Sequence, residues 1–157
     1  MRRFLVLILL PALVAGSAMA AKPKPKTLQL RATSLGKVIV DSKKRTLYML
    51  TADGKNSSSC SGQCAVNWPP ALAPKKPTLV KALKRTKLKV IRRSDGAKQL
   101  AYAGHPLYRF VGDSKPGDVN GEGVNAFGGL WYVLSKSGAA VTGAQAPPPQ
   151  PMTGYGY

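Results

Sequence analysis

The heptapeptide LYMLTAD at residues 47–53 returns sixty residues later as LYRFVGD at residues 107–113. The shared pattern is L-Y-x-[LF]-x-x-D, and at the same offset of sixty residues Val40 corresponds to Leu100. Each copy continues into a polar, glycine-rich loop that reaches a tryptophan, Trp68 or Trp131. Two copies of a unit too small to fold alone predict one duplicated domain with a shared core.

Around each heptapeptide the pattern is typical of β-structure, because short β-branched and aromatic runs alternate with turn residues. It predicts two hairpins, one with strands 37–41 and 45–50 and one with strands 99–102 and 107–110. Residues 130–134 predict a further strand, and residues 87–92 an edge strand with its cations facing outwards. The spacing of leucine and valine over residues 78–84 allows one short helix. We therefore expect an all-β fold, a compact domain of two hairpin-based repeats with at most a short helix, flanked by disordered termini.

The N-terminus reads as a signal peptide over residues 1–20. Arg2 and Arg3 precede an apolar run, and Ala18-Met19-Ala20 places small residues at a cleavage site. The run is too short to span a bilayer, and no second apolar segment follows, so we expect an exported mature chain without a transmembrane segment, periplasmic or extracellular.

The expected domain boundaries follow from changes in composition along the chain. They are a Lys/Pro linker at 21–27, a β-repeat domain at 28–141, and a disordered Pro/Gly/Tyr tail at 142–157. Within the domain we expect repeat one at about 34–72, a basic connector at 73–93 and repeat two at about 94–135.

The motifs resemble those of a bacterial family of secreted repeats, described as predicted lipoproteins with a Y-x-[FWY]-x-x-D motif. The second copy, residues 108–113, matches this motif in full, whereas Leu50 replaces the aromatic residue in the first. The segments CSGQCAVNWPP at 60–70 and PGDVNG at 116–121 are also characteristic, so the resemblance covers about residues 34–135. The chain lacks the cysteine that a lipoprotein would acylate. The resemblance implies a β-rich envelope or secreted protein and no settled activity.

Cys60 and Cys64 are the only cysteines, four residues apart in a Ser/Gly-rich loop. Exported cysteines normally pair, so we expect a disulfide. The alternative is a copper site, in which the two thiolates would act with His105, the only histidine, and Met49. So few histidines and cysteines exclude a zinc ribbon or a multi-disulfide scaffold, and we expect no cofactor.

Asp53 and Asp113 end the two motif copies, and Tyr48, Tyr108 and Phe110 precede them. Carboxylates at equivalent repeat positions are typical of turns in which they accept main-chain N–H groups. The alternative is a small hydrolase that uses the two aspartates as acid and base. We expect no enzyme.

The loop after the second motif places oxygen-bearing side chains at Asp118, Asn120 and Glu122, which resembles the first half of a calcium loop. The closing glutamate is missing, because the twelfth position is Gly129. We expect a tight polar turn and keep the three residues only as candidate metal ligands.

The charge is strongly positive, with 24 Lys+Arg against 6 Asp+Glu and a formal net charge of +18. Removal of residues 1–20 takes away Arg2 and Arg3 and leaves +16. Such a charge predicts partners that are anionic envelope polymers or lipid surfaces; nucleic acid is disfavoured, because few aromatics interleave with the cations. Ten cations fall between Lys75 and Lys98. The residues expected to bind anions are Lys81, Lys84, Arg85, Lys87, Lys89, Arg92 and Arg93, unless this stretch is only a solvated connector.

Overall fold

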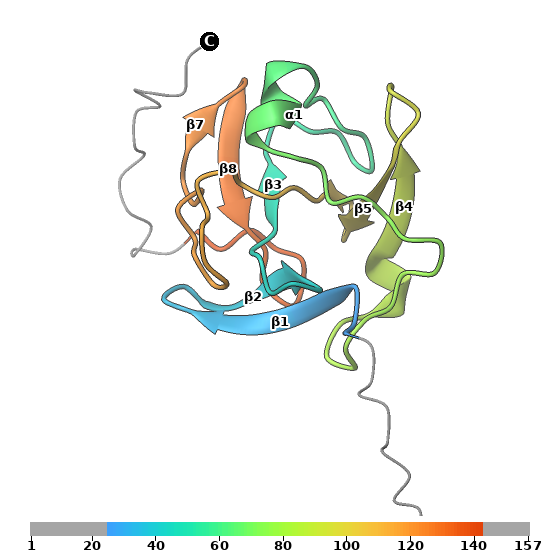
Figure 1. Ribbon diagram of the computed structural model, residues 1–157, viewed down its shortest axis with the longest axis vertical. Helices are drawn as coiled ribbons and strands as arrows, with labels where there is room; N and C mark the ends of the chain where they lie inside the picture. Colours follow the sequence, from blue (N-terminus) through green and yellow to red (C-terminus); the bar gives the residue numbers. More distant parts are fainter. Residues whose placement is uncertain (1–24, 143–157) are drawn as a thin grey trace, which may run out of the picture.

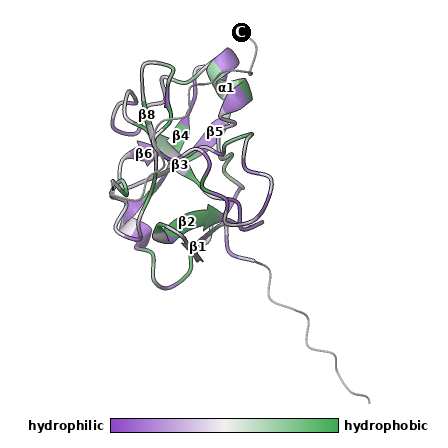
Figure 2. Ribbon diagram, turned by 90° about the vertical axis from the view of Figure 1, so that its left-hand side faces the viewer, coloured by the Kyte–Doolittle hydropathy of each residue, from purple (hydrophilic) through white to green (hydrophobic). Residues whose placement is uncertain are grey.

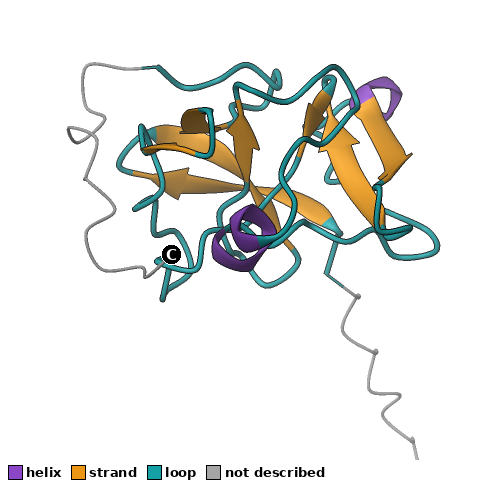
Figure 3. Ribbon diagram, turned by 90° about the horizontal axis from the view of Figure 1, so that it is seen from above, coloured by secondary structure: helices purple, strands orange, loops and turns teal. Residues whose placement is uncertain are grey.

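The computed structural model describes residues 25–142, which form a β-rich domain with one short helix (Figures 1 and 3). The all-β expectation is confirmed. The signal peptide and almost all of the tail lie outside the described residues. The elements are β1 (Leu28–Thr33), β2 (Gly36–Asp41), β3 (Tyr48–Leu50), α1 (Gln63–Asn67), η1 (Arg85–Lys87, a 3-10 turn), β4 (Leu88–Arg92), β5 (Lys98–Tyr102), β6 (His105–Pro106), β7 (Asn125–Ala126) and β8 (Gly129–Val133).

The strands form three small sheets, β1-β2, β3-β8-β7 and β4-β5-β6. In Figure 1 the β1-β2 hairpin lies across the bottom of the molecule and β4-β5 at one side. β4 is an edge strand with Lys89 and Arg92 exposed, as expected, but Val90 is exposed as well, so burial along it does not alternate strictly. None of the helices among residues 25–142 is long and apolar enough to cross a membrane.

Each repeat opens with an antiparallel hairpin, and the two hairpins share one register. Leu28 pairs with Asp41 at the end of β1-β2, and Leu88 pairs with Tyr102 at the end of β4-β5. Asp41 and Tyr102 are therefore equivalent, and β4 is the first strand of repeat two, although we placed it in the basic connector. The strand at β1 was not predicted.

The turn that follows each hairpin differs in length between the repeats. Asp41 and Arg45 enclose a three-residue turn, through the hydrogen bond from Asp41 N to Arg45 O at 2.9 Å. In repeat two only Ala103 and Gly104 lie between β5 and β6, both with positive φ. Residues of β2 therefore correspond to residues of β5 that lie 61 positions later, so Val40 corresponds to Ala101 and not to Leu100.

The two repeats exchange strands after these turns. β3 of repeat one pairs with β8 at the end of repeat two, with Tyr48 opposite Val133. Reciprocally, Tyr108 bridges Pro70 at the end of repeat one, and Val111 N donates to Asn67 O at 3.1 Å. The predicted hairpin of residues 37–50 is therefore wrong as a closed unit: the chain does reverse at residues 42–44, but β2 pairs chiefly with β1 and β3 with β8.

The core has two parts, because residues alternate along the central strands. Val38, Val40, Tyr48 and Leu50 face a cluster around Trp68 and Trp131. The intervening Ile39, Leu47 and Met49 face a second cluster that contains Leu28, Leu88 and Tyr102. In Figure 2 β2 is coloured as hydrophobic, which agrees with its position between the clusters.

The predicted helix over residues 78–84 is wrong. Leu28 N donates to Thr78 O at 3.1 Å and Val80 N donates to Leu28 O at 3.2 Å, so residues 78–80 are extended beside the start of β1, and residues 81–83 form a turn. The 3-10 turn η1 begins only at Arg85, and α1 at Gln63–Asn67 was not predicted.

Gly121 packs directly against the rings of Trp68 and Tyr48, so a side chain at this position should be destabilising. A Cβ at this position would lie 2.7 Å and 2.8 Å from ring atoms of Trp68, and 3.0 Å from a ring atom of Tyr48. Gly121→Ala should therefore lower the free energy of unfolding by about 1–3 kcal/mol through overpacking. Urea denaturation followed by tryptophan fluorescence measures the loss.

Gly54→Ala is the matched control, since its nearest contact would be Ser57 Cβ at 3.4 Å. Equal effects of the two alanines would contradict the packing argument.

Candidate functional site

The motif tyrosines lie side by side at the junction of the repeats. Tyr48 N donates to Tyr108 O at 2.9 Å, and Tyr108 N donates to Tyr48 O at 3.0 Å. Each phenol then reaches the motif carboxylate of the other repeat: Tyr48 Oη donates to Asp113 Oδ2 at 2.8 Å and Tyr108 Oη to Asp53 Oδ2 at 2.7 Å. The motif thus ties each repeat to the other.

The second oxygen of each aspartate accepts a main-chain N–H within its own turn. Ser59 N donates to Asp53 Oδ1 at 2.7 Å, and Asn120 N donates to Asp113 Oδ1 at 3.0 Å. Burial raises the pKa of Asp113 to about 6 and that of Tyr48 well above its ordinary value. Carboxylates engaged in this way stabilise turns, and the geometry adds no support to the hydrolase alternative.

The two tryptophans stack at the centre of this junction, with ring centroids 3.8 Å apart and an interplanar angle of 4°. Tyr48 contacts Trp68 edge-on at 5.4 Å, and Tyr108 contacts Trp131 edge-on at 5.2 Å. Phe110 stacks on Trp68 at 4.2 Å. Both tryptophans are fully buried. These aromatic rings hold the repeats together and are not accessible to a ligand.

Cys60 and Cys64 form the expected disulfide, with a Cα–Cα distance of 5.3 Å. Since both sulfurs are in this bond, neither is a thiolate, and the copper alternative is wrong in the form that requires two of them. His105 lies in β6, where burial lowers its pKa, and Met49 is buried in the second cluster.

The candidate calcium ligands serve separate structural roles. Asp118 Oδ2 accepts N–H groups of Ser114 and Lys115, and Asn120 Nδ2 donates to Gly112 O. Glu122 points into the protein. In residues 25–142 no three His, Cys, Asp or Glu side chains gather where they could hold a metal.

Glu122 is 2% exposed. Its Oε2 accepts the N–H of Val133 at 2.6 Å, while Oε1 has no hydrogen-bond partner among the described residues. Burial raises the pKa of this carboxyl to about 7. The sequence marked Glu122 as polar but gave no sign that the fold buries it.

The predicted anion-binding residues divide into two groups. Lys81, Lys84, Arg85, Lys89 and Arg92 are exposed, and Lys87 is half-buried.

Arg93, in contrast, is 6% exposed and donates to Cys60 O at 2.6 Å and to Gln99 Oε1 at 2.8 Å. Arg93 thus holds the disulfide loop against β5, and its guanidinium is not available to an external anion. Including it in the anion-binding set was wrong.

Three lysines surround a cavity of about 320 Å³, lined by Ala82, Lys84, Lys87, Lys136 and Ser137. We call it the lysine pocket. Tyr102 positions its two walls: Lys84 N donates to Tyr102 Oη at 3.0 Å, and Tyr102 Oη donates to Lys136 O at 3.3 Å. Lys87 Nζ reaches Ser137 O at 2.5 Å. Sequence reasoning missed Lys136, an isolated lysine in a Ser-Lys-Ser turn far from the basic stretch.

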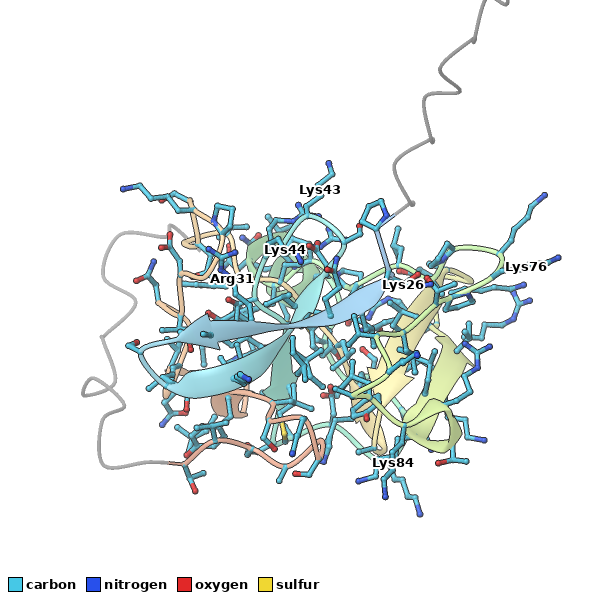
Figure 4. The ribbon with its side chains drawn as sticks, turned by 90° about the horizontal axis from the view of Figure 1, so that it is seen from below. Lys26, Arg31, Lys43, Lys44, Lys76 and Lys84 are labelled. Carbon is cyan, nitrogen blue, oxygen red and sulfur yellow. A yellow bond between two sulfur atoms is a disulfide. The ribbon has the colours of Figure 1, made fainter. Side chains whose placement is uncertain are left out.

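Cations also surround the outer face of β1. Figure 4 shows Lys43, Lys76 and Lys84 projecting from different edges of this face, so the positive charge is spread around the domain. The lysine pocket is a local concentration within it.

We call the two hydrogen bonds from Tyr48 to Asp113 and from Tyr108 to Asp53 the Tyr–Asp exchange. Together with the exchange of strands, they define a duplicated β-repeat protein, which carries a basic surface. The chain belongs to the family described as a secreted repeat of unknown function (Lipoprotein_15), which matches residues 30–72 and 89–135, more than half of the chain. The expected resemblance and export are confirmed, and the second match begins within β4. No curated protein and no solved structure matches the chain.

The Tyr–Asp exchange predicts a specific energetic coupling. Tyr48→Phe and Asp113→Ala should each destabilise, and in a double-mutant cycle they should show a coupling energy of about 1–2 kcal/mol, because each removes the same hydrogen bond. Urea denaturation of the four proteins measures it.

Tyr48→Phe combined with Asp53→Ala is the control, since Asp53 pairs with the other tyrosine. Additivity to within about 0.5 kcal/mol is expected there. Equal coupling in both cycles would refute the exchanged pairing.

Glu122 predicts a pH dependence of stability. Its folded pKa of about 7 exceeds the ordinary 4.5, so between these values the folded protein keeps a proton that the unfolded chain releases. Stability therefore falls as pH rises from 4.5 to 7, by on the order of 2 kcal/mol. Glu122→Gln should remove most of this slope in urea denaturation at pH 5 and pH 8.

Asp113 adds a smaller slope of the same sign up to about pH 6, which remains in this variant. Asp95→Asn is the control, because the main-chain N–H of Ala97 lowers the pKa of Asp95 and its titration falls below this window. An unchanged slope in Glu122→Gln would contradict the assignment.

Proposed function

We propose that this exported protein is a non-enzymatic binder of anionic polymers or lipid surfaces, and that the lysine pocket is the centre of its basic face. The observation that carries the proposal is the pocket itself. Among residues 25–142 the ion pairs join Asp41 to Arg45 and Arg109, and Asp95 to Arg93. Lys84, Lys87 and Lys136 thus face their common cavity without a carboxylate partner in the described part of the chain.

All six acidic residues of the chain lie among the described residues, and each accepts a hydrogen bond from within the domain. Asp41, Asp95 and Asp118 accept N–H groups of neighbouring turns. Asp53 and Asp113 accept the motif tyrosines, and Glu122 accepts Val133 N. Asp95 remains exposed, so the acids are few rather than hidden. A net charge of this size favours fast, salt-sensitive association with anions.

The position of the aromatic residues argues against nucleic acid as the partner. Single-stranded nucleic acid binds on exposed aromatic platforms beside cations. The large hydrophobic side chains exposed on residues 25–142 are Val66, Leu72, Val90 and Val111, none of them aromatic. The surface offers charge without stacking, which suits phosphate or carboxylate groups on a polymer or a lipid layer.

The test is binding of the mature protein to phosphatidylglycerol-containing vesicles and to poly(glycerol phosphate), measured by co-sedimentation and by pull-down. Each lysine near an anionic surface adds about 1 kcal/mol. The triple variant Lys84→Gln, Lys87→Gln, Lys136→Gln should bind at least about tenfold more weakly at low salt. Binding of the wild type should be lost at high salt, because screening shortens the range of exposed charges.

The matched control is Lys37→Gln, Lys75→Gln, Lys76→Gln, which removes the same charge from exposed positions outside the pocket. It should weaken binding by less than half as much on a logarithmic scale. Equal losses in the two variants would show that net charge alone acts. Binding that ignores salt would refute the basic face as the binding surface.

A further inference from the structure

A second cationic cavity occupies the equivalent position in repeat one. It is an open cavity of about 770 Å³, and its lining includes Pro25, Thr27, Asp41, Ala73 and Pro74. The paired strands match Leu28 to Leu88 and Asp41 to Tyr102, and the stacked tryptophans match Trp68 to Trp131. At these offsets the five residues correspond, in order, to Arg85, Lys87, Tyr102, Lys136 and Ser137. All of these except Arg85 build or position the lysine pocket. The duplication has thus produced two cavities of the same origin.

In this second cavity the counterparts of Lys87 and Lys136 are Thr27 and Ala73, which carry no charge. Its positive charge comes instead from Lys43, Arg45 and Arg109. At the same offsets, Arg45 corresponds to His105 and Arg109 to Met49. Both cavities are therefore cationic, and Lys43, Arg45 and Arg109 occupy positions other than those of Lys87 and Lys136.

The two arginines share one carboxylate. Arg45 Nε and Nη2 lie 2.9 Å and 2.7 Å from Asp41 Oδ2, and Arg109 Nε lies 3.3 Å from the same oxygen. The other oxygen, Oδ1, accepts the N–H groups of Lys43 and Arg45. The Asp41 carboxylate is thereby fully engaged, and the buried Nε of Arg109 lies near it without forming a hydrogen bond to any described residue.

Holding two guanidinium groups together without a second anion is unfavourable. The Arg109 side chain is only 27% exposed. Burial and the nearby Arg45 charge lower the pKa of Arg109, which reports the same cost. An oxyanion between the guanidinium groups would relieve this repulsion and accept paired N–H···O bonds, the geometry in which arginine binds carboxylates and phosphates.

The surrounding charges decide which side of the arginine pair the anion approaches. A smaller cavity of about 230 Å³ also borders Arg45 and Arg109, but Asp113 lines it. The larger cavity holds three cations against Asp41 alone. Its other wall is Ala71, Leu72, Ala73 and Pro74, which leaves room for the body of a ligand beside its charged group.

We propose that this cavity is a binding site for a single oxyanion, a phosphate or carboxylate group held by Arg45 and Arg109 with Lys43 at the rim. We call it the arginine site. It does not depend on the lysine pocket: Figure 4 shows Lys43 and Lys84 on opposite edges of the β1 face.

The experiment follows the Nε–H signals of the arginines by NMR while inorganic phosphate or acetate is added at constant ionic strength. The signals of Arg45 and Arg109 should shift saturably with at least one of the two anions. The anion that saturates the shift at the lower concentration shows whether the site prefers a phosphate or a carboxylate group. Arg109→Gln and, separately, Arg45→Gln should each weaken this binding at least tenfold.

Arg45 is more exposed than Arg109, so Arg45→Gln keeps the test valid if Arg109→Gln fails to fold. The lysine-pocket triple variant should bind both anions at this site as the wild type does, which separates failure of this site from failure of the basic face. Shifts spread equally over Arg31 and Arg92, no saturation with either anion, or unchanged binding in Arg45→Gln would overturn the proposal.

Discussion

The mutual pair of main-chain hydrogen bonds between Tyr48 and Tyr108 is the constraint on which the rest of the structure depends. It sets the motif strands antiparallel, so each must find its next partner at the far end of the other repeat. That exchange brings Trp68 against Trp131 and carries each phenol to the opposite aspartate. A single repeat would expose its tryptophan and leave a tyrosine hydroxyl and a carboxylate unpaired, and buried polar groups without partners are costly. The two copies therefore fold together.

The sequence predicted what local chemistry controls. The repeated heptapeptide, the Cys60–Cys64 disulfide and the edge strand β4 all follow from residues close together in the chain. The exchange of strands does not, because a short alternating run pairs equally well with any strand of matching pattern. The shift in register before the turns depends on one extra turn residue in repeat one, and periodicity carries no trace of it. The helix expected at residues 78–84 failed because pairing with the end of β1 outweighed a weak local preference.

The binding surfaces were predicted only in part for a related reason. Counting cations along the chain found Lys84 and Lys87, but it could not separate them from Arg93, which the fold turns inward onto Cys60 and Gln99. Lys136 joins the pocket only through Tyr102, a contact across 34 residues. Arg45 and Arg109 are 64 residues apart and meet only at Asp41. Charge density in sequence thus finds a basic region, while the grouping of charges is a property of the tertiary structure.

The duplication separates the residues that hold the fold from those that are free to differ. At the junction, Tyr48 and Tyr108 each donate to the motif aspartate of the other repeat, and the two tryptophans stack on each other. A change on one side would therefore leave a partner on the other side unpaired. The residues around the lysine pocket and the arginine site do not share this reciprocity. Where repeat two has Tyr102 joining two loops, repeat one has Asp41 bound to two arginines. Asp41 contacts Arg109 of repeat two, whereas its counterpart Tyr102 contacts Lys84 and Lys136. These equivalent positions therefore took different partners while the Tyr–Asp contacts stayed the same. Both linings carry excess positive charge, one through Lys87 and Lys136 and the other through Arg45 and Arg109. Among the described residues, the charge itself rather than a shared side chain is thus what the two cavities have in common.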